Sequence, residues 1–257
     1  MSFKNDGSVH YAGIANEKEM CKLLTEVNHY GAEVIHQGGT KQVRDAYVKN
    51  LVDISIKNWK DKGTYDWYNT APLAAEIGLD KIIKPFIEQF KKDIENVPDE
   101  DHKTYRKQEQ DRLNKIIGSK IDDLWSPEIA DKVINHFISH TKDMDVVVHH
   151  RIAKKVYIYK FDDHPVVSYY KKGYKPILIY KKDPNSASRT IFMEKDGHRV
   201  DTALRVRFTN TNSLKPYTNE PCSGKNKKNT STSACLKLQQ EKLDKLLANV
   251  PTVCYNY

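Results

Sequence analysis

The spacing of hydrophobic residues changes twice along the chain and predicts three regions. Near the N-terminus, apolar and polar residues alternate with the two-residue period of half-buried strands. From Leu79 to Met144 the apolar residues recur every three or four positions, which predicts amphipathic helices. From Asp145 onward, short apolar runs are separated by Pro, Gly, Asp and Asn, which predicts strands. The pattern predicts an α+β protein with an α/β core and a strand-rich C-terminal half.

The C-terminal half is expected to end in a helix after a series of strands. The helix covers LKLQQEKLDKLLANV (236–250), where leucines recur with helical spacing. The predicted strands are VVVHH (146–150), KVYIYKF (155–161), PVVSYY (165–170), PILIYKK (176–182), TIFMEKD (190–196) and ALRVRFTN (203–210).

The first two strands form a hairpin whose register follows from their alternation. Ala46 and Val48 occupy one face of the first strand, and Val52 and Ile54 occupy one face of the second. A hairpin that buries both apolar faces together must pair residues whose numbers have an even sum, for example Val48 with Val52 and Ala46 with Ile54 around a loop of Lys49, Asn50 and Leu51. A shift by a single residue would turn one set of apolar side chains to the wrong face.

This register brings polar groups together on the other face of the hairpin. Asp45 lies opposite Ser55, and Asp53, Ser55 and Lys57 follow each other at every second position of one strand. A carboxylate in such a place can hold a divalent cation. A nearby lysine can orient or deprotonate an attacking water. The hairpin therefore contains the groups that a metal-dependent phosphodiesterase requires.

A helix before this hairpin contributes further carboxylates. Asn16 is the predicted N-cap, and Glu19 is the residue expected to close a capping box with it. Glu17 has no capping role and could turn toward Asp45 from the first turn of the helix. The buried stripe of this helix is predicted to be Met20, Cys21, Leu24 and Val27.

The hairpin resembles the core of the PD-(D/E)xK, or restriction-endonuclease-like, nuclease superfamily. That family has an Asp on one strand and, after a turn, an acidic or sometimes polar residue, one apolar residue and Lys. The matching residues are Asp45, Ser55, Ile56 and Lys57, preceded by a Gly38-Gly39 turn. The resemblance covers roughly residues 13 to 70, about a quarter of the chain. Ser55 departs from the pattern, because the family most often has Glu, Asp or Gln there.

The resemblance implies a Mg²⁺-dependent DNA endonuclease with a mixed central sheet flanked by helices. Asp45 would be the principal metal ligand, and Glu17 and Asp53 would be auxiliary ligands. Lys57 would position the attacking water, with Ser55 as a further ligand or orienting group. A type II restriction-like enzyme that cuts double-stranded DNA is the first expectation.

The implied organisation is a nuclease core with a helical cover over residues 1–144 and a DNA-contacting region over 145–257. A single continuous domain is the alternative. A palindromic target would imply a twofold homodimer.

A set of aromatic, basic and amide residues is expected to contact DNA. Aromatic rings set among lysines and amides suit bases and phosphates, and arginines on a strand can grip phosphate or read guanine. The alternatives are that the tryptophans belong to the core and that the arginines occupy an ordinary exposed sheet face. The predicted DNA-binding residues are Lys41, Asn58, Trp59, Lys60, Tyr65, Asp66, Trp67, Asn69, Arg205, Arg207, Asn210 and Asn212.

Composition favours a polyanionic partner. The 257 residues contain 42 Lys and Arg against 34 Asp and Glu, a formal charge of +8. The chain has no apolar run of the roughly 20 residues that span a bilayer, and its start lacks the apolar core of a signal peptide. We therefore expect an intracellular, cytoplasmic protein without a membrane partner. The four cysteines are scattered and include no C-x-x-C pair.

Three other functions are compatible with these patterns. One is a structure-specific repair or recombination nuclease of the same superfamily. The second is a non-catalytic DNA-binding protein in which Ser55 marks a decayed metal site. The third is a structural or assembly protein with a basic surface.

Overall fold

Helices and two sheets make up the computed structural model of the protein. It describes residues 8–38, 44–59, 64–69, 78–179, 186–208, 214–220, 235–239 and 248–257. The described α-helices are α1 (Ser8–Glu26), α3 (Asp80–Ile94), α4 (His102–Leu124), α5 (Pro127–Thr141) and α6 (Pro165–Lys171). Short 3-10 turns occupy η1 (Asp99–Asp101), η2 (Phe161–Asp163) and η3 (Lys215–Tyr217).

The strands form a mixed sheet and an antiparallel sheet. The six-stranded sheet has the order β1-β2-β3-β5-β6-β11, and the five-stranded sheet has the order β4-β10-β9-β8-β7. Within the described pairs of the first sheet, β3 and β5 run parallel and their other neighbours run antiparallel. The strands are β1 (Ile35–His36), β2 (Ala46–Val48), β3 (Val52–Trp59), β4 (Thr64–Asn69), β5 (Met144–His150), β6 (Lys155–Lys160), β7 (Lys175–Ile179), β8 (Ser188–Lys195), β9 (His198–Arg207), β10 (Cys235–Gln239) and β11 (Val253–Asn256).

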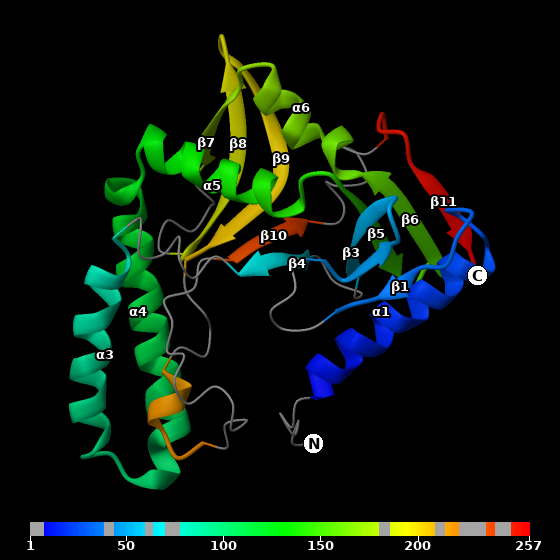
Figure 1. Cartoon of the computed structure of the whole chain (residues 1–257). Coiled ribbons are helices and arrows are strands. Elements are labelled where there is room, and N and C mark those ends of the chain that lie inside the picture. Colours follow the sequence, from blue (N-terminus) through cyan, green and yellow to red (C-terminus); the bar gives the residue numbers. More distant parts are fainter. Residues whose placement is uncertain are drawn as a thin grey trace.

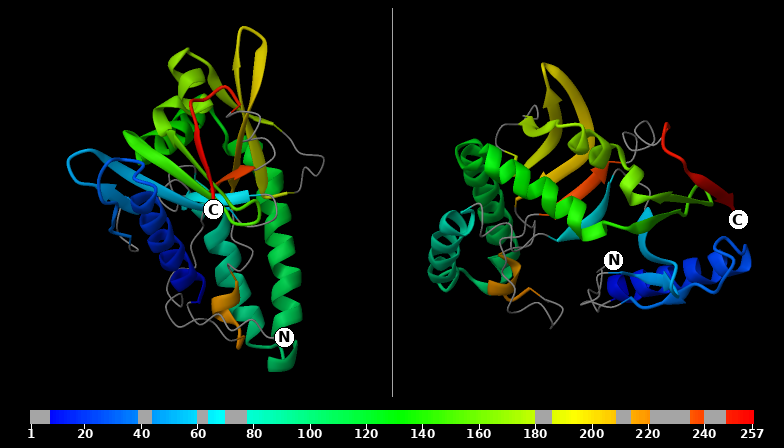
Figure 2. Two further views of the ribbon diagram at one scale, coloured as in Figure 1. Left: turned by 90° about the vertical axis from the view of Figure 1, so that its right-hand side faces the viewer. Right: turned by 45° about the horizontal axis from the view of Figure 1, so that its top comes forward.

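This arrangement confirms the predicted α+β class with a mixed sheet flanked by helices. Figures 1 and 2 show α1 against one sheet and the α3–α4 pair beside the other. Each sheet combines strands from both sides of residue 144, because β5, β6 and β11 join β1–β3 while β4 joins β7–β10. None of the described helices is both long and apolar enough to cross a membrane.

The hairpin of β2 and β3 has the register predicted from the alternation of its residues. Val48 pairs with Val52 and Ala46 pairs with Ile54. The turn between the strands contains Asn50 with a φ of 60°. Asparagine tolerates this left-handed conformation better than most side chains, so the turn residue matches its backbone.

The first helix begins earlier than its predicted N-cap. Asn16 lies in the middle of α1 and is 2% exposed, so it caps nothing, and the expected capping box with Glu19 is wrong. Glu19 instead pairs with Arg151, with 3.3 Å between Oε2 and Nη2. Val27 lies beyond the end of α1 and is 40% exposed, in contrast to its predicted burial.

Helix α1 covers the six-stranded sheet through a small apolar core. Met20, Cys21 and Leu24 are buried as predicted and pack with residues of β2, β3 and β5. The shared cluster contains Val34, Ala46, Val48, Ile54, Ile56, Val147, Val156 and Ile158. This packing sets the position of the remaining polar residues of α1 relative to the hairpin.

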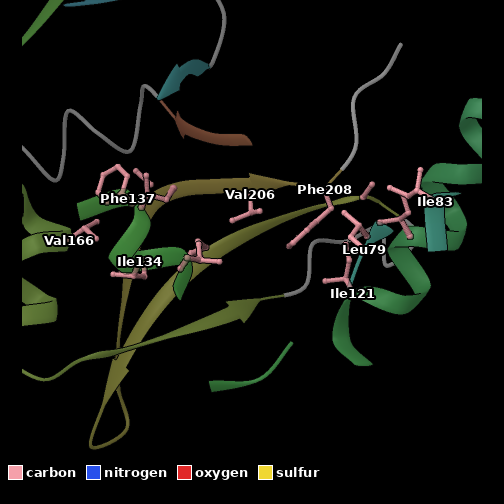
Figure 3. Packing of buried hydrophobic residues seen from close by; sticks show 14 of the residues in the cluster. Leu79, Ile83, Ile121, Ile134, Phe137, Val166, Val206 and Phe208 are labelled. Atoms are coloured by element: carbon pink, nitrogen blue, oxygen red, sulfur yellow. The ribbon is translucent and has the colours of Figure 1, made fainter. Parts of the chain in front are cut away.

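A larger core joins α3, α4 and α5 to the five-stranded sheet. Figure 3 shows side chains from these helices against Val206 and Phe208, which come from β9 and the position just after it. The three helices confirm the amphipathic pattern predicted between Leu79 and Met144. They form the cover of the second sheet.

Two predicted elements differ in the structure. Residues 165–170 were expected to be a strand but lie in α6, where Pro165 occupies the first turn and the His164 ring accepts a hydrogen bond from Val166 N at 3.2 Å. Capping therefore outweighs the β-branched composition of this segment. The first residues of the predicted C-terminal helix form β10, which is hydrogen-bonded on both sides, to β4 and β9. Residues 240–247 lie outside the described part of the chain.

Candidate active site

The carboxylate of Asp45 is fixed at the end of the β2–β3 hairpin. Its backbone N–H donates to Ile54 O at 3.0 Å, which extends the strand pairing by one residue. Its side-chain Oδ2 accepts hydrogen bonds from Ile56 N at 2.6 Å and from Ser55 Oγ at 3.3 Å. The predicted apposition of Asp45 and Ser55 is therefore confirmed. Within the described residues both bonds use Oδ2, so Oδ1 is the oxygen available to a ligand.

Glu17 approaches the same region from α1. Its Oε2 lies 2.9 Å from Nε2 of His36, the last residue of β1. The two side chains are about one-fifth exposed, at 19% and 20%. A Cβ atom added to Gly38 would lie 2.0 Å from the same Glu17 oxygen, so the backbone of Gly38 packs directly against the pair. A side chain at this position would have to displace the carboxylate of Glu17 and the ring of His36.

The residue before Glu17 anchors this part of the helix. Asn16 Oδ1 lies 2.5 Å from Nδ1 of the buried His149 on β5, and His149 Nε2 contacts the hydroxyl of Tyr257. Burial lowers the pKa of His149. A neutral imidazole can donate through one nitrogen and accept through the other, so it can bridge both partners. Asn16 and His149 are both buried, and their contact joins the turn of α1 that carries Glu17 to β5.

The charges of Glu17, Asp45 and Lys57 influence one another. Burial raises the pKa of Glu17, the hydrogen bond with His36 opposes that shift, and the negative charge of Asp45 adds to it. Burial lowers the pKa of Lys57, and the charges of Asp45 and Glu17 oppose this effect. Burial also raises the pKa of Cys21 to about 11, with both carboxylates contributing. The structure therefore brings two carboxylates and a lysine into one electrostatic cluster.

Asp53 was predicted to be an auxiliary metal ligand, but its side chain has another partner. Its carboxylate forms an ion pair with Arg44, whose guanidinium also lies 4.4 Å from the ring centroid of Tyr47. Asp53 shares its strand face with Ser55 and lies one alternation further from the cluster. We therefore place Asp53 outside the group formed by Asp45 and Glu17.

The cluster offers two carboxylates to a cation. In the described part of the chain, no group of three or more His, Cys, Asp or Glu side chains could hold a metal ion. Mg²⁺ commonly retains several waters and binds through one or two carboxylates together with substrate phosphates. Asp45 and Glu17 fit this mode of binding, whereas they do not form an all-protein metal cage.

Most residues predicted to contact DNA lie on three strands, and the others lie outside the described part of the chain. Asn58 and Trp59 lie at the end of β3, Tyr65, Asp66, Trp67 and Asn69 lie on β4, and Arg205 and Arg207 lie on β9. The predicted alternation on β9 is present between Leu204 and Val206, which are buried, with the partly exposed Arg205 between them. Lys41, Lys60, Asn210 and Asn212 lie outside the described residues.

His36 is the one member of the cluster that the sequence reasoning missed. It directly precedes Gln37 and Gly38, and a polar ring followed by a glycine turn was the available signal. Its partner is 19 positions away, so the contact depends on how α1 packs on the sheet. Comparison of the chain with protein-family models, curated proteins and solved structures gives no match.

Proposed function

We propose that the protein is a Mg²⁺-dependent endonuclease that hydrolyses phosphodiester bonds in double-stranded DNA, with sequence specificity like that of type II restriction enzymes. The observation that carries the proposal is the position of Asp45. Its Oδ2 is held by the Ile56 N–H at 2.6 Å, and its charge acts on both Glu17 and Lys57. A carboxylate fixed on a strand end beside a second carboxylate and a lysine suits metal-assisted phosphoryl transfer.

Each residue of the cluster has a role in this proposal. Asp45 and Glu17 would hold the cation by carboxylate oxygens, and Ser55 orients Asp45 through its hydroxyl. The cation would supply charge stabilisation at the phosphate during hydrolysis. Lys57 presents an ammonium group that can donate hydrogen bonds to the attacking water or to a phosphate oxygen. The basic chain, with a formal charge of +8, favours a polyanionic substrate.

The proposal includes the partners and location that such an activity requires. Double-stranded DNA is the partner and the cytoplasm is the site of action, and a palindromic target would require a homodimer. A structure-specific repair or recombination nuclease would use the same cluster on branched or single-stranded substrates.

A second candidate is a non-catalytic DNA-binding protein. Ser55 occupies the position where the resembling family most often has an acidic residue, and its hydroxyl is bonded to Asp45. Only two carboxylates of the described residues meet at the cluster. Both observations fit a site that has lost metal-dependent chemistry and kept its DNA-binding surface.

A cleavage assay with matched variants separates these functions. Purified protein is incubated with duplex DNA of mixed sequence in Mg²⁺ or in EDTA, beside Asp45→Ala and Lys57→Ala. Lys49→Ala, in the exposed turn of the same hairpin, and Asp123→Ala, exposed on α4, are the charge-matched controls. The proposal requires discrete fragments from the wild type and both controls with Mg²⁺, and intact DNA from the two site variants.

The remaining outcomes select among the alternatives. Uncleaved duplex DNA with salt-dependent binding by every variant would support the non-catalytic DNA-binding protein. Cleavage confined to branched or single-stranded DNA would support the repair nuclease. Absence of DNA affinity at low salt would exclude all three DNA functions and leave the structural protein with a basic surface.

A further inference from the structure

We propose that His36 is a positioning residue that fixes the carboxylate of Glu17 so that its other oxygen, Oε1, faces a divalent cation. This inference rests on the proposed function, because it assigns a role to a neighbour of the proposed metal ligands. It extends the cluster to a histidine on β1, an element that carries none of the other proposed ligands.

The first support is the contact itself. Nε2 of His36 lies 2.9 Å from Oε2 of Glu17, within the range of a hydrogen bond between an imidazole N–H and a carboxylate. The partners come from β1 and α1, which pack together. Both side chains are largely covered, which shields the bond from competing water.

The second support is steric and independent of the hydrogen bond. The added Cβ at Gly38 would meet Glu17 Oε2 at 2.0 Å and His36 Nε2 at 2.8 Å. Real Cβ atoms do not approach heavy atoms so closely, so the backbone at Gly38 closes one side of the pair. Oε2 is therefore enclosed by an imidazole and a peptide backbone, and Oε1 is the carboxylate oxygen left for another ligand.

Such enclosure has a thermodynamic consequence for cation binding. A glutamate side chain loses up to about 2 kcal/mol of rotamer freedom when it is ordered. If His36 orders Glu17 before a cation arrives, part of that cost is removed from the binding step. Residues that orient metal ligands in this way typically change metal affinity by roughly 10–100-fold when they are replaced.

The test measures metal affinity without DNA and without turnover. Mn²⁺ binding to the full-length protein is followed by isothermal titration calorimetry for the wild type, His36→Ala and His36→Gln. Glutamine places an amide N–H near the position of the imidazole Nε2 and should restore most of the affinity. His36→Ala should bind Mn²⁺ about 10–100-fold more weakly.

Two further variants make the outcomes distinguishable. His29→Ala is the matched control, because His29 lies just beyond the C-terminal end of α1 and also has a side-chain partner, the Tyr255 hydroxyl at 2.8 Å. It should leave Mn²⁺ affinity unchanged. Asp45→Ala tests the proposed metal site itself, and its failure to weaken Mn²⁺ binding would overturn the proposed function together with this inference.

The inference fails by itself under two results. In the first, Asp45→Ala abolishes Mn²⁺ binding while His36→Ala binds like the wild type. In the second, His36→Ala and His36→Gln are equally weak and both lower the melting temperature of the metal-free protein, which would make His36 a packing residue. Weak binding by His36→Ala, recovery by His36→Gln and unchanged binding by His29→Ala support the positioning role.

Discussion

The Asp45 carboxylate accepts the backbone N–H of Ile56 at 2.6 Å, at the point where the pairing of β2 with β3 ends. One side chain therefore both caps the hairpin and carries the charge that acts on Glu17 and Lys57. Its structural and chemical roles must be separated by a substitution that preserves one of them.

Asp45→Asn makes that separation. The amide oxygen can still accept the Ile56 N–H, so the melting temperature should remain within about 4 °C of the wild type, which corresponds to about 1 kcal/mol. The missing charge should reduce Mg²⁺-dependent DNA cleavage about 100-fold or more, comparable to the loss of a major electrostatic group in other active sites. Thermal denaturation and a cleavage time course measure the two effects. Equal destabilisation by Asp45→Asn and Asp45→Ala would show that the hydrogen bond does not hold the hairpin end.

The hairpin shows what local pattern can predict. Its register follows from two-residue alternation together with a short loop, because a shift by one residue would expose Ala46 and Val48 or bury polar residues. The apposition of Asp45 with Ser55 is a direct geometric consequence of that register, and the structure confirms it. Strand positions of this kind are determined by residues only a few places apart.

The parts that sequence could not supply depend on distant contacts or on capping. Asn16 is of a residue type that favours N-caps, but it lies inside α1, where its side chain is hydrogen-bonded to His149 on β5. The Glu17–His36 contact likewise requires the packing of α1 on the sheet. The segment after His164 has strand-forming residues, and its helical start is set by one proline and one side-chain cap. The first residues of the predicted last helix form β10 instead, because they pair with β4 on one side and β9 on the other.

Gly38 and Gly13 should respond to alanine in opposite directions. A methyl group at Gly38 would displace the ends of the Glu17 and His36 side chains and break the hydrogen bond between them, so Gly38→Ala should cost about 0.5–1.5 kcal/mol. Gly13 lies inside α1 with no atom within 4 Å of an added Cβ. Gly13→Ala should stabilise the protein by about 0.5–1 kcal/mol through helix propensity.

Urea denaturation of both glycine variants checks these signs. Because Gly38→Ala displaces Glu17, it should also weaken Mn²⁺ binding, whereas Gly13→Ala should not. A stable Gly38→Ala protein with normal Mn²⁺ affinity would contradict the enclosure of the Glu17 carboxylate. Each variant adds one methyl group to the wild type, so the comparison isolates the effect of where that group is placed.

His164 should make stability depend on pH. It is fully buried near Phe137 and Phe161, and burial lowers its pKa to about 3, below its usual value of about 6.5. Between pH 3 and pH 6.5, His164 is therefore protonated in the unfolded chain and neutral in the folded protein. The contribution of His164 to the free energy of unfolding should be complete above about pH 6.5. It should fall by up to about 1.4 kcal/mol per pH unit as the pH drops toward 3.

His164→Asn provides the control for this titration. Asparagine can keep the acceptor for the Val166 N–H at the start of α6 while removing the ionisable ring. Its smaller volume should lower stability at every pH, so the readout is the slope between pH 7 and pH 5. The wild type should lose about 2 kcal/mol more than the variant over this range. Parallel slopes for the two proteins would remove His164 as the source of the acid sensitivity.

Asn58 tests whether a buried polar atom is retained for function. Its Oδ1 is buried and has no hydrogen-bond partner within the described part of the chain, and it follows Lys57 at the end of β3. An unsatisfied buried carbonyl costs roughly 1–3 kcal/mol, so Asn58→Leu, which has a similar size, should be as stable as the wild type or up to about 1 kcal/mol more stable. If the partly exposed Asn58 side chain serves the proposed DNA contact, the same variant should bind duplex DNA more weakly in fluorescence anisotropy without metal. Higher stability with lower DNA affinity would identify a residue kept at a cost to the fold. Destabilisation by more than about 2 kcal/mol would instead show that the amide is satisfied by buried water and serves the structure.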